Sequence, residues 1–205
     1  MKNKLFNFFV LSIIFISTAV LIQSCAVSTL PSQPLSFNKG TSEKGLLVGS
    51  VTFPKEKAKC NGYFFRLTNN SSAEFQIQPS QFSKMKHNGQ LDNGRTYLFI
   101  IERPEGKNEI PSVRLFGNSG ITALQSTNYV GGFSIPYEIK KGEITYLGNI
   151  KFNEYAEKGE KVVTLENNFE NDINELKKLQ PSVDWSDVKN DENRKIEYNN
   201  KKARL

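Results

Sequence analysis

The sequence has little of what nucleophilic and metal-dependent chemistry requires. Among 205 residues there are two cysteines and one histidine, His87. A Ser–His or Cys–His pair would have to use that one imidazole, and a zinc site needs three or four Cys, His or carboxylate ligands. No EF-hand, P-loop, dinucleotide or GxSxG spacing occurs either. We therefore predict no metal, no cofactor and no enzymatic activity.

A strong charge of one sign is also lacking. The chain has 27 Lys and Arg residues against 21 Asp and Glu residues, a net charge of +6, and the basic residues are scattered. Nucleic-acid binding needs a basic stripe or patch, so no nucleic-acid partner is predicted. A solvated surface is the simplest interpretation of the excess, and loose attraction to anionic lipid or polysaccharide is the alternative.

The first 24 residues have the three-part organisation of a secretory signal. Lys2 and Lys4 form its positive end, the run from Leu5 to Ile22 is mainly apolar, and small Ser24 precedes Cys25. The stretch ending in Ile-Gln-Ser-Cys resembles a bacterial lipobox, with a glutamine where a small or apolar residue is more common. The resemblance implies cleavage before Cys25 and acylation of its thiol with fatty chains such as palmitate.

Acylation at Cys25 would attach the chain to a membrane permanently, because two or more acyl chains hold stably where one holds reversibly. No acidic residue follows within Ala26–Thr29. In the lipoproteins of well-studied diderm bacteria, an aspartate directly after the cysteine favours retention in the inner membrane, so the resemblance implies the outer membrane here. Two alternatives stay open. In the first, the apolar run is an uncleaved inner-membrane anchor, because its length approaches the ~20 residues that span a bilayer. In the second, the segment is a plain signal peptide.

The second cysteine, Cys60, has no partner for an intramolecular disulfide if Cys25 is acylated. It stands at the start of an apolar run, which predicts burial and low reactivity. An intermolecular disulfide is the alternative.

The rest of the chain divides into three parts. Residues 25–45 are rich in Ser, Pro, Thr, Gly and Lys and are predicted to form a flexible tether. Residues 46–186 are predicted to form one domain, and the polar residues 187–205 a tail that is a frayed helix or disordered.

Within the domain, apolar residues alternate with polar ones, and Gly- or Asn-containing turns separate the runs. Such alternation is typical of half-buried strands. The predicted strands are Leu46–Phe53, Gly62–Thr68, Glu74–Gln78, Arg95–Arg103, Ser112–Phe116, Phe133–Ile139, Glu143–Phe152 and Val162–Leu165. They predict a mainly β fold, an antiparallel β-sandwich of seven or eight strands.

After the strands the period changes. Four apolar residues share one helical stripe in Phe169–Leu179, acidic residues occupy the first turn and lysines the last, and Pro181 follows. The pattern predicts one C-terminal amphipathic helix that packs on the sandwich.

Aromatic side chains fall into two groups. Those that follow the inward pattern, such as Tyr63 and Phe65, are predicted to be core. Phe64, Phe116 and Tyr129 are off this pattern and are the candidates for a binding surface. Glu102, Glu105 and Glu109 cluster near one predicted turn; they form a charged loop in the simplest interpretation, and a hydrolytic carboxylate pair in the alternative.

The segment Tyr137–Ile150, YEIKKGEITYLGNI, resembles a hairpin of uncharacterised bacterial envelope lipoproteins with a transthyretin-like or immunoglobulin-like sandwich. The resemblance implies a fold and an envelope location, and no catalytic residue. We therefore expect a lipid-anchored binding, accessory or structural module with a protein or polysaccharide partner. A surface hydrolase and an inner-membrane protein with an uncleaved anchor are the alternatives.

Overall fold

A computed structural model of the chain describes residues 26–27, 30–31, 33–55, 58–68, 73–79, 88–118 and 125–199. The signal segment, the lipidation candidate Cys25 and His87 lie outside these ranges. The strands are β1 (Ala26–Val27), β2 (Lys44–Thr52), β3 (Gly62–Leu67), β4 (Ala73–Ile77), β5 (Thr96–Pro104), β6 (Gly106–Ile110), β7 (Val113–Asn118), β8 (Gln125–Val130), β9 (Phe133–Ile139), β10 (Ile144–Phe152), β11 (Val163–Glu166), β12 (Val188–Asn190) and β13 (Glu197–Tyr198). The helix α2 spans Phe169–Leu179.

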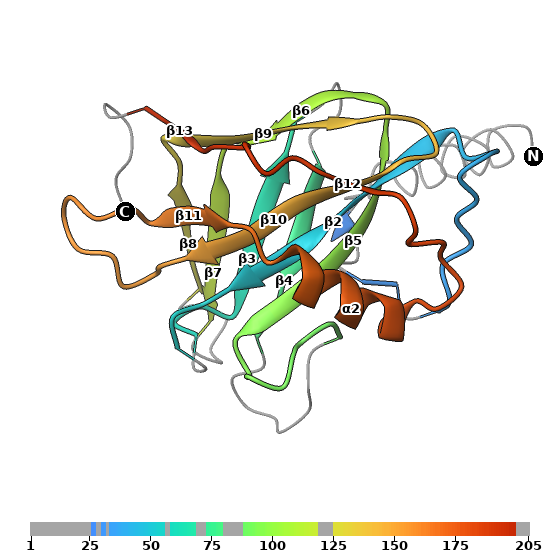
Figure 1. Cartoon of the computed structure of the whole chain (residues 1–205). Helices are drawn as coiled ribbons and strands as arrows, with labels where there is room; N and C mark the ends of the chain where they lie inside the picture. The colour runs from blue at the N-terminus through green and yellow to red at the C-terminus, as the bar shows by residue number, and fades with distance from the viewer. Residues whose placement is uncertain are drawn as a thin grey trace, which may run out of the picture.

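The strands form three sheets, and the prediction of a mainly β chain with antiparallel pairing is confirmed. The rear sheet has the order β1-β4-β3-β7-β8, the helix-covered sheet the order β11-β10-β2-β5, and the small sheet the order β13-β9-β6. Figure 1 shows the rear sheet behind the helix-covered sheet, with the small sheet across the top.

Three pairings depart from the antiparallel expectation, and one of them is the parallel pair of the short β1 with β4. β10 runs parallel to β2, with Ile144 opposite Leu46, and also parallel to the short β12. The register shifts between Tyr146 and Asn149, where Gly148 adopts φ +120. This bulge separates the half of β10 that pairs with β12 from the half that pairs with β11.

The main core lies between the sheets and is built by the alternation in the strands. Tyr63 and Phe65 of β3 meet Phe99 of β5 and Phe152 of β10 in one buried cluster. Their rings pack edge-on or stacked, as between Phe65 and Phe75 at 4.8 Å. Burying each such side chain contributes about 2–3 kcal/mol, so this aromatic cluster dominates the packing of the sheets.

The helix α2 covers the outer face of the helix-covered sheet and forms a second core. Ile173 and Leu176 pack on Leu46 and Val48. Beside them, Asp172 is fully buried and accepts hydrogen bonds from Ser50 Oγ at 2.5 Å and Tyr146 Oη at 2.8 Å. A buried carboxylate requires such donors, so this cluster fixes where the helix sits.

The segment predicted to be a tether lies differently in its described part. Leu30 and Phe37 are buried in the second core, so apolar burial holds the chain where its composition predicted flexibility. Gln180 completes the attachment: its Oε1 accepts from Leu35 N at 2.7 Å, and its Nε2 donates to the carbonyls of Pro31 and Gln33.

The predicted tail also differs, because part of it joins two sheets. β12 pairs with β10, and β13 pairs with β9. Both pairings satisfy backbone groups, which is why a segment with few apolar residues still lies on the domain. Across the described ranges, no helix has the length and hydrophobicity needed to cross a bilayer.

Candidate binding surfaces

The three off-pattern aromatic residues lie on one surface. In β3, Tyr63 and Phe65 point into the core, so Phe64 points to the outer face of the rear sheet. Phe116 and Tyr129 occupy the corresponding face of β7 and β8, since their neighbours Leu115 and Val130 are core residues. We call this outer face, with Phe64, Arg114, Phe116 and Tyr129, the aromatic platform.

Three platform residues stand in a row across neighbouring strands. Phe64 pairs with Arg114, and Arg114 pairs with Tyr129. The guanidinium of Arg114 lies over the Phe64 ring, 3.8 Å from its centroid. Since strands are about 4.8 Å apart, Phe64 and Tyr129 are separated by roughly 10 Å along this row.

A carboxylate on β4, which lies two strands away from β7 in the rear sheet, fixes the position of Arg114. Its Nε donates to Glu74 Oε1 at 3.2 Å, and its Nη2 donates to Glu74 Oε2. The hydrogen bond and charge of Glu74 raise the pKa of Arg114. The two-pronged geometry holds the guanidinium plane in one orientation, so Arg114 presents a rigid, flat surface.

Exposure differs among the aromatic residues. Tyr129 is 66% exposed, whereas Phe64 and Phe116 are half-buried. Large exposed aromatic side chains are uncommon on soluble domains and mark contact surfaces when polar groups surround them. Tyr129 is therefore the protruding ring of the aromatic platform.

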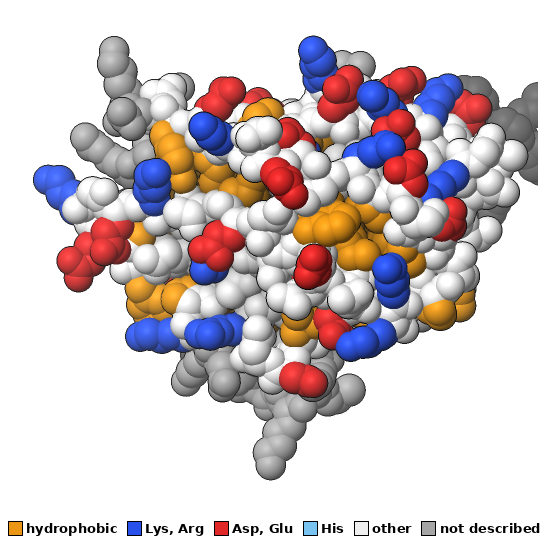
Figure 2. All heavy atoms as spheres, in the orientation of Figure 1, with side chains coloured by type: hydrophobic (Ala, Val, Ile, Leu, Met, Phe, Trp, Pro, Cys, Tyr) orange, Lys and Arg blue, Asp and Glu red, His pale blue; other side chains and the backbone are white. Residues whose placement is uncertain are grey.

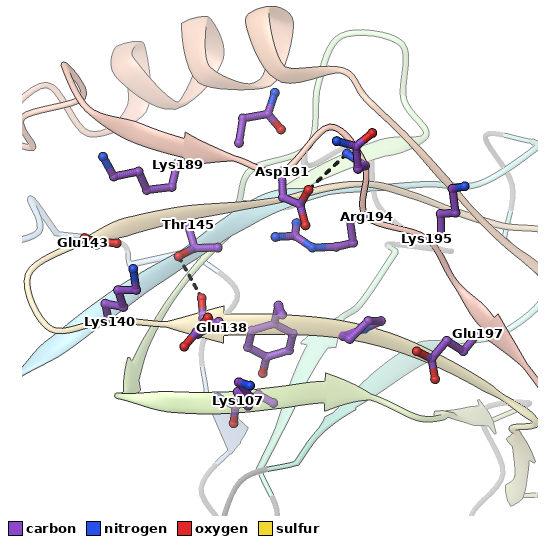
Figure 3. A pocket seen from close by; sticks show the side chains of 15 residues that line it. Lys107, Glu138, Lys140, Glu143, Thr145, Lys189, Asp191, Arg194, Lys195 and Glu197 are labelled. Carbon is purple, nitrogen blue, oxygen red and sulfur yellow. Dashed lines mark hydrogen bonds between the residues drawn. The ribbon is translucent and has the colours of Figure 1, made fainter.

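A groove opens where β9 and β10 diverge after their shared turn. Its volume is about 680 Å³, and β6, β9, β10 and the segment from β12 to β13 contribute its walls. Figure 3 shows Asp191 and Arg194 pointing into it from one side, with Glu138 and Glu197 far apart on the other. The lining residues are Lys107, Asn108, Pro136, Tyr137, Glu138, Lys140, Glu143, Thr145, Lys189, Asn190, Asp191, Asn193, Arg194, Lys195 and Glu197.

Most of the charged residues in the groove are exposed, so water screens them. Glu143 is half-buried, and so is Arg194. Its Nη1 donates to the carbonyls of Tyr146 and Leu147, at 2.6 and 2.7 Å, and burial lowers its pKa. This arginine ties the segment between β12 and β13 to the bulge of β10.

Two buried polar residues border the groove. Tyr137 and Asn108 face each other across β9 and β6, and the buried Arg103 is close enough to oppose the rise in the tyrosine's pKa. Burial nonetheless raises the pKa of Tyr137 to about 12. Tyr137 Oη, Asn108 Oδ1 and two nitrogens of Arg103 have no hydrogen-bond partner within the described structure. Burying such atoms costs free energy, so this corner is a weak point of the fold.

A larger opening, of about 1130 Å³, lies between α2 and the loop around residues 88–96. Amide side chains dominate its lining, including Asn88, Asn93 and Asn168. Some of these amides already make hydrogen bonds within the protein: Asn88 donates to the Leu30 carbonyl, and Asn93 donates to Thr96 Oγ1. They attach the loop to the sheet and to the segment before β2.

The acidic candidates for hydrolysis lie elsewhere. Glu102 pairs with Lys44 at 3.5 Å, and Glu109 accepts a hydrogen bond from Ser134. Glu102, Glu105 and Glu109 line neither of these openings. Within the described ranges, no group of three His, Cys, Asp or Glu residues has the geometry to hold a metal ion.

Cys60 is half-buried, and desolvation raises the pKa of its thiol.

Sequence reasoning located the aromatic rings but missed Arg114 and Glu74. Their pairing depends on the order of β4, β3 and β7, which no local pattern encodes. The groove was missed because one of its walls belongs to the predicted tail. No family model, no curated protein and no solved structure matches this chain.

Proposed function

We propose that the chain is a bacterial envelope lipoprotein, acylated at Cys25 and located in the outer membrane, whose domain binds polysaccharide on the aromatic platform. The domain is proposed to be an antiparallel β-sandwich of seven or eight main strands with one C-terminal amphipathic helix. The transthyretin-like or immunoglobulin-like resemblance of Tyr137–Ile150 supports this fold. The signal pattern of residues 1–24 supports the location.

The observation that carries the binding proposal is the row formed by Phe64, Arg114 and Tyr129. Extended β-linked polysaccharides have flat faces of C–H groups, which pack on aromatic rings and on guanidinium planes. The distance of roughly 10 Å between the ends of the row is close to the length of two sugar units. Hydroxyl groups of the sugar would find hydrogen-bonding partners in Glu74 and Gln76, which neighbour the row.

The charge of the platform fits a neutral or weakly charged glycan. Arg114 is paired with Glu74, so the centre of the row has no net charge. A strongly anionic polymer would need unpaired cations for its affinity. Peptidoglycan and chitin, both built on β-linked amino sugars, are therefore suitable probes.

The test is co-sedimentation of the full chain with purified peptidoglycan and with chitin. We expect Tyr129→Ala to weaken binding about tenfold, equivalent to ~1.4 kcal/mol. Asn128→Ala is the matched control, because Asn128 is exposed on the same strand but pairs with the core residue Leu115. Wild-type protein that sediments with neither polymer, or a Tyr129→Ala variant that binds as well as wild type, would contradict the proposal.

A further inference from the structure

The proposed lipid anchor is followed very closely by residues that are fixed on the domain. Leu30 comes five positions after Cys25 and is buried in the second core, 2% exposed. At 3.3–3.6 Å per residue, five residues span at most about 18 Å. β1 shortens this further, because Ala26 and Val27 pair with Glu74 and Phe75 of β4.

The fixed segment lies against the C-terminal end of α2. Gln180, which follows the last helical residue, is 3% exposed and holds Pro31, Gln33 and Leu35 through its side chain. Ser182 Oγ donates to the Leu35 carbonyl at 3.1 Å, and Trp185 Nε1 donates to the Gln180 carbonyl at 3.0 Å. These hydrogen bonds hold the segment against the end of the helix.

The last turn of α2 has the character of a membrane-contacting surface. Leu179 is 41% exposed, and Lys177 and Lys178 beside it are exposed as well. An exposed leucine next to lysines suits the boundary between acyl chains and anionic headgroups, where the lysine stems lie along apolar surface. Figure 2 shows further hydrophobic side chains on the face that carries α2.

We infer that the domain lies directly on the bilayer, with the C-terminal turn of α2 and the segment around Leu30 at the headgroup level. This inference rests on the proposed acylation of Cys25. The composition of the segment predicted a flexible tether of about twenty residues between the lipid and the domain. The inference instead holds the domain within a few residues of the lipid. The loop that joins β10 and β11 lies at the opposite end of the domain from the C-terminal turn of α2 (Figure 1). The inference therefore places this loop on the side that faces away from the membrane.

The test uses full-length protein extracted from membranes and reconstituted in phosphatidylethanolamine–phosphatidylglycerol vesicles that contain a headgroup spin-labelled lipid. A fluorophore is placed on Leu179→Cys or on Lys158→Cys, each in a Cys60→Ser background. Lys158 is exposed in the β10–β11 loop. We expect the spin label to quench the fluorophore at position 179 at least threefold more than at 158. Equal quenching at the two positions would overturn the inference.

A second variant tests whether the short anchor sets this position. Fifteen Gly and Ser residues inserted between Cys25 and Ala26 lengthen the anchor but leave the pairing of β1 with β4 and every contact of Gln180 in place. Quenching at position 179 should then fall towards the value at 158, and unchanged quenching would contradict the inference. Emission of Trp185, the single tryptophan, checks that the helix end stays folded.

Mass measurement separates the two proposals. If Cys25 carries acyl chains but both labels are quenched equally, the orientation is wrong and the lipid anchor stands. If Cys25 carries no acyl chain, both are wrong.

Discussion

The guanidinium of Arg114 stacks on the ring of Phe64, 3.8 Å from the ring centroid, while Glu74 holds it from the side. This arrangement joins an aromatic ring, a flat cation and the exposed Tyr129 into one surface. A lysine at position 114 would keep the charge but lose both the planar stack and the two-pronged pairing.

Arg114→Lys should therefore weaken polysaccharide binding about tenfold, or ~1.4 kcal/mol, while the thermal midpoint of unfolding changes little. Arg95→Lys serves as the control, since Arg95 is an exposed arginine that lies before β5, outside the rear sheet. Co-sedimentation with peptidoglycan measures the binding. Both substitutions keep the positive charge, so equal losses in the two variants would contradict a specific role of the stacked arginine.

Loss of the hydroxyl group should change the free energy of unfolding differently at two buried tyrosines, Tyr63 and Tyr137. Tyr63 Oη donates to Glu154 and accepts from Cys60 N, so Tyr63→Phe should lower the free energy of unfolding by about 1–3 kcal/mol. Tyr137 Oη has no partner in the described structure, so Tyr137→Phe should leave stability unchanged or raise it slightly. Urea unfolding measures both, and a larger loss in Tyr137→Phe would show that its hydroxyl is bonded after all.

Stability should depend on pH through Asp172. Burial raises the pKa of this carboxyl, against hydrogen bonds from Ser50, Tyr146 and Asn168 that lower it. Because the pKa of Asp172 is higher in the folded state than in the unfolded state, the protonated carboxyl contributes to the free energy of unfolding. This contribution is fully present below the unfolded pKa, near 4, and is lost as pH rises through the folded pKa. The thermal midpoint of wild type minus that of Asp172→Asn should therefore fall as pH rises from about 4. A difference that grows over this range would contradict the raised pKa.

Two glycines with positive φ allow a matched test of close packing. In the turn between β9 and β10, Gly142 has φ +67, and a Cβ there would overlap the Lys39 carbonyl oxygen. Gly159 has φ +99, and a Cβ there meets nothing within 4 Å. Gly159→Ala should cost about 1–2 kcal/mol of backbone strain, and Gly142→Ala clearly more. Similar losses on urea unfolding would mean that Lys39 does not pack on this turn.

The mainly β character was predictable because alternation is a local signal. The run from Phe133 to Ile139 alternates without a break, and it is the strand β9. β8 has no such alternation, since its sequence QSTNYV is mostly polar, and it exists because β7 supplies a partner. The parallel pairing of β2 with β10 joins residues almost one hundred positions apart, which no local pattern encodes.

The candidate surface was predictable only in part. Being off the inward pattern identifies Phe64, Phe116 and Tyr129 as outward-facing, but the row they form with Arg114 depends on strand order and register. The segment before β2 was read from its Ser and Pro content, and the burial of Leu30 and Phe37 depends on a helix far along the chain. Composition indicates how flexible a segment is in isolation, but tertiary contacts determine whether it becomes ordered on the domain.

The most direct test of the account is the intact mass of the protein extracted from membranes, measured beside Cys25→Ala. We predict loss of residues 1–24 and an increment of two or three acyl chains on wild type, with neither processing nor increment in the variant. A wild-type chain that retains its N-terminus, or lacks the increment, would contradict the lipid anchor on which the proposed location and orientation rest.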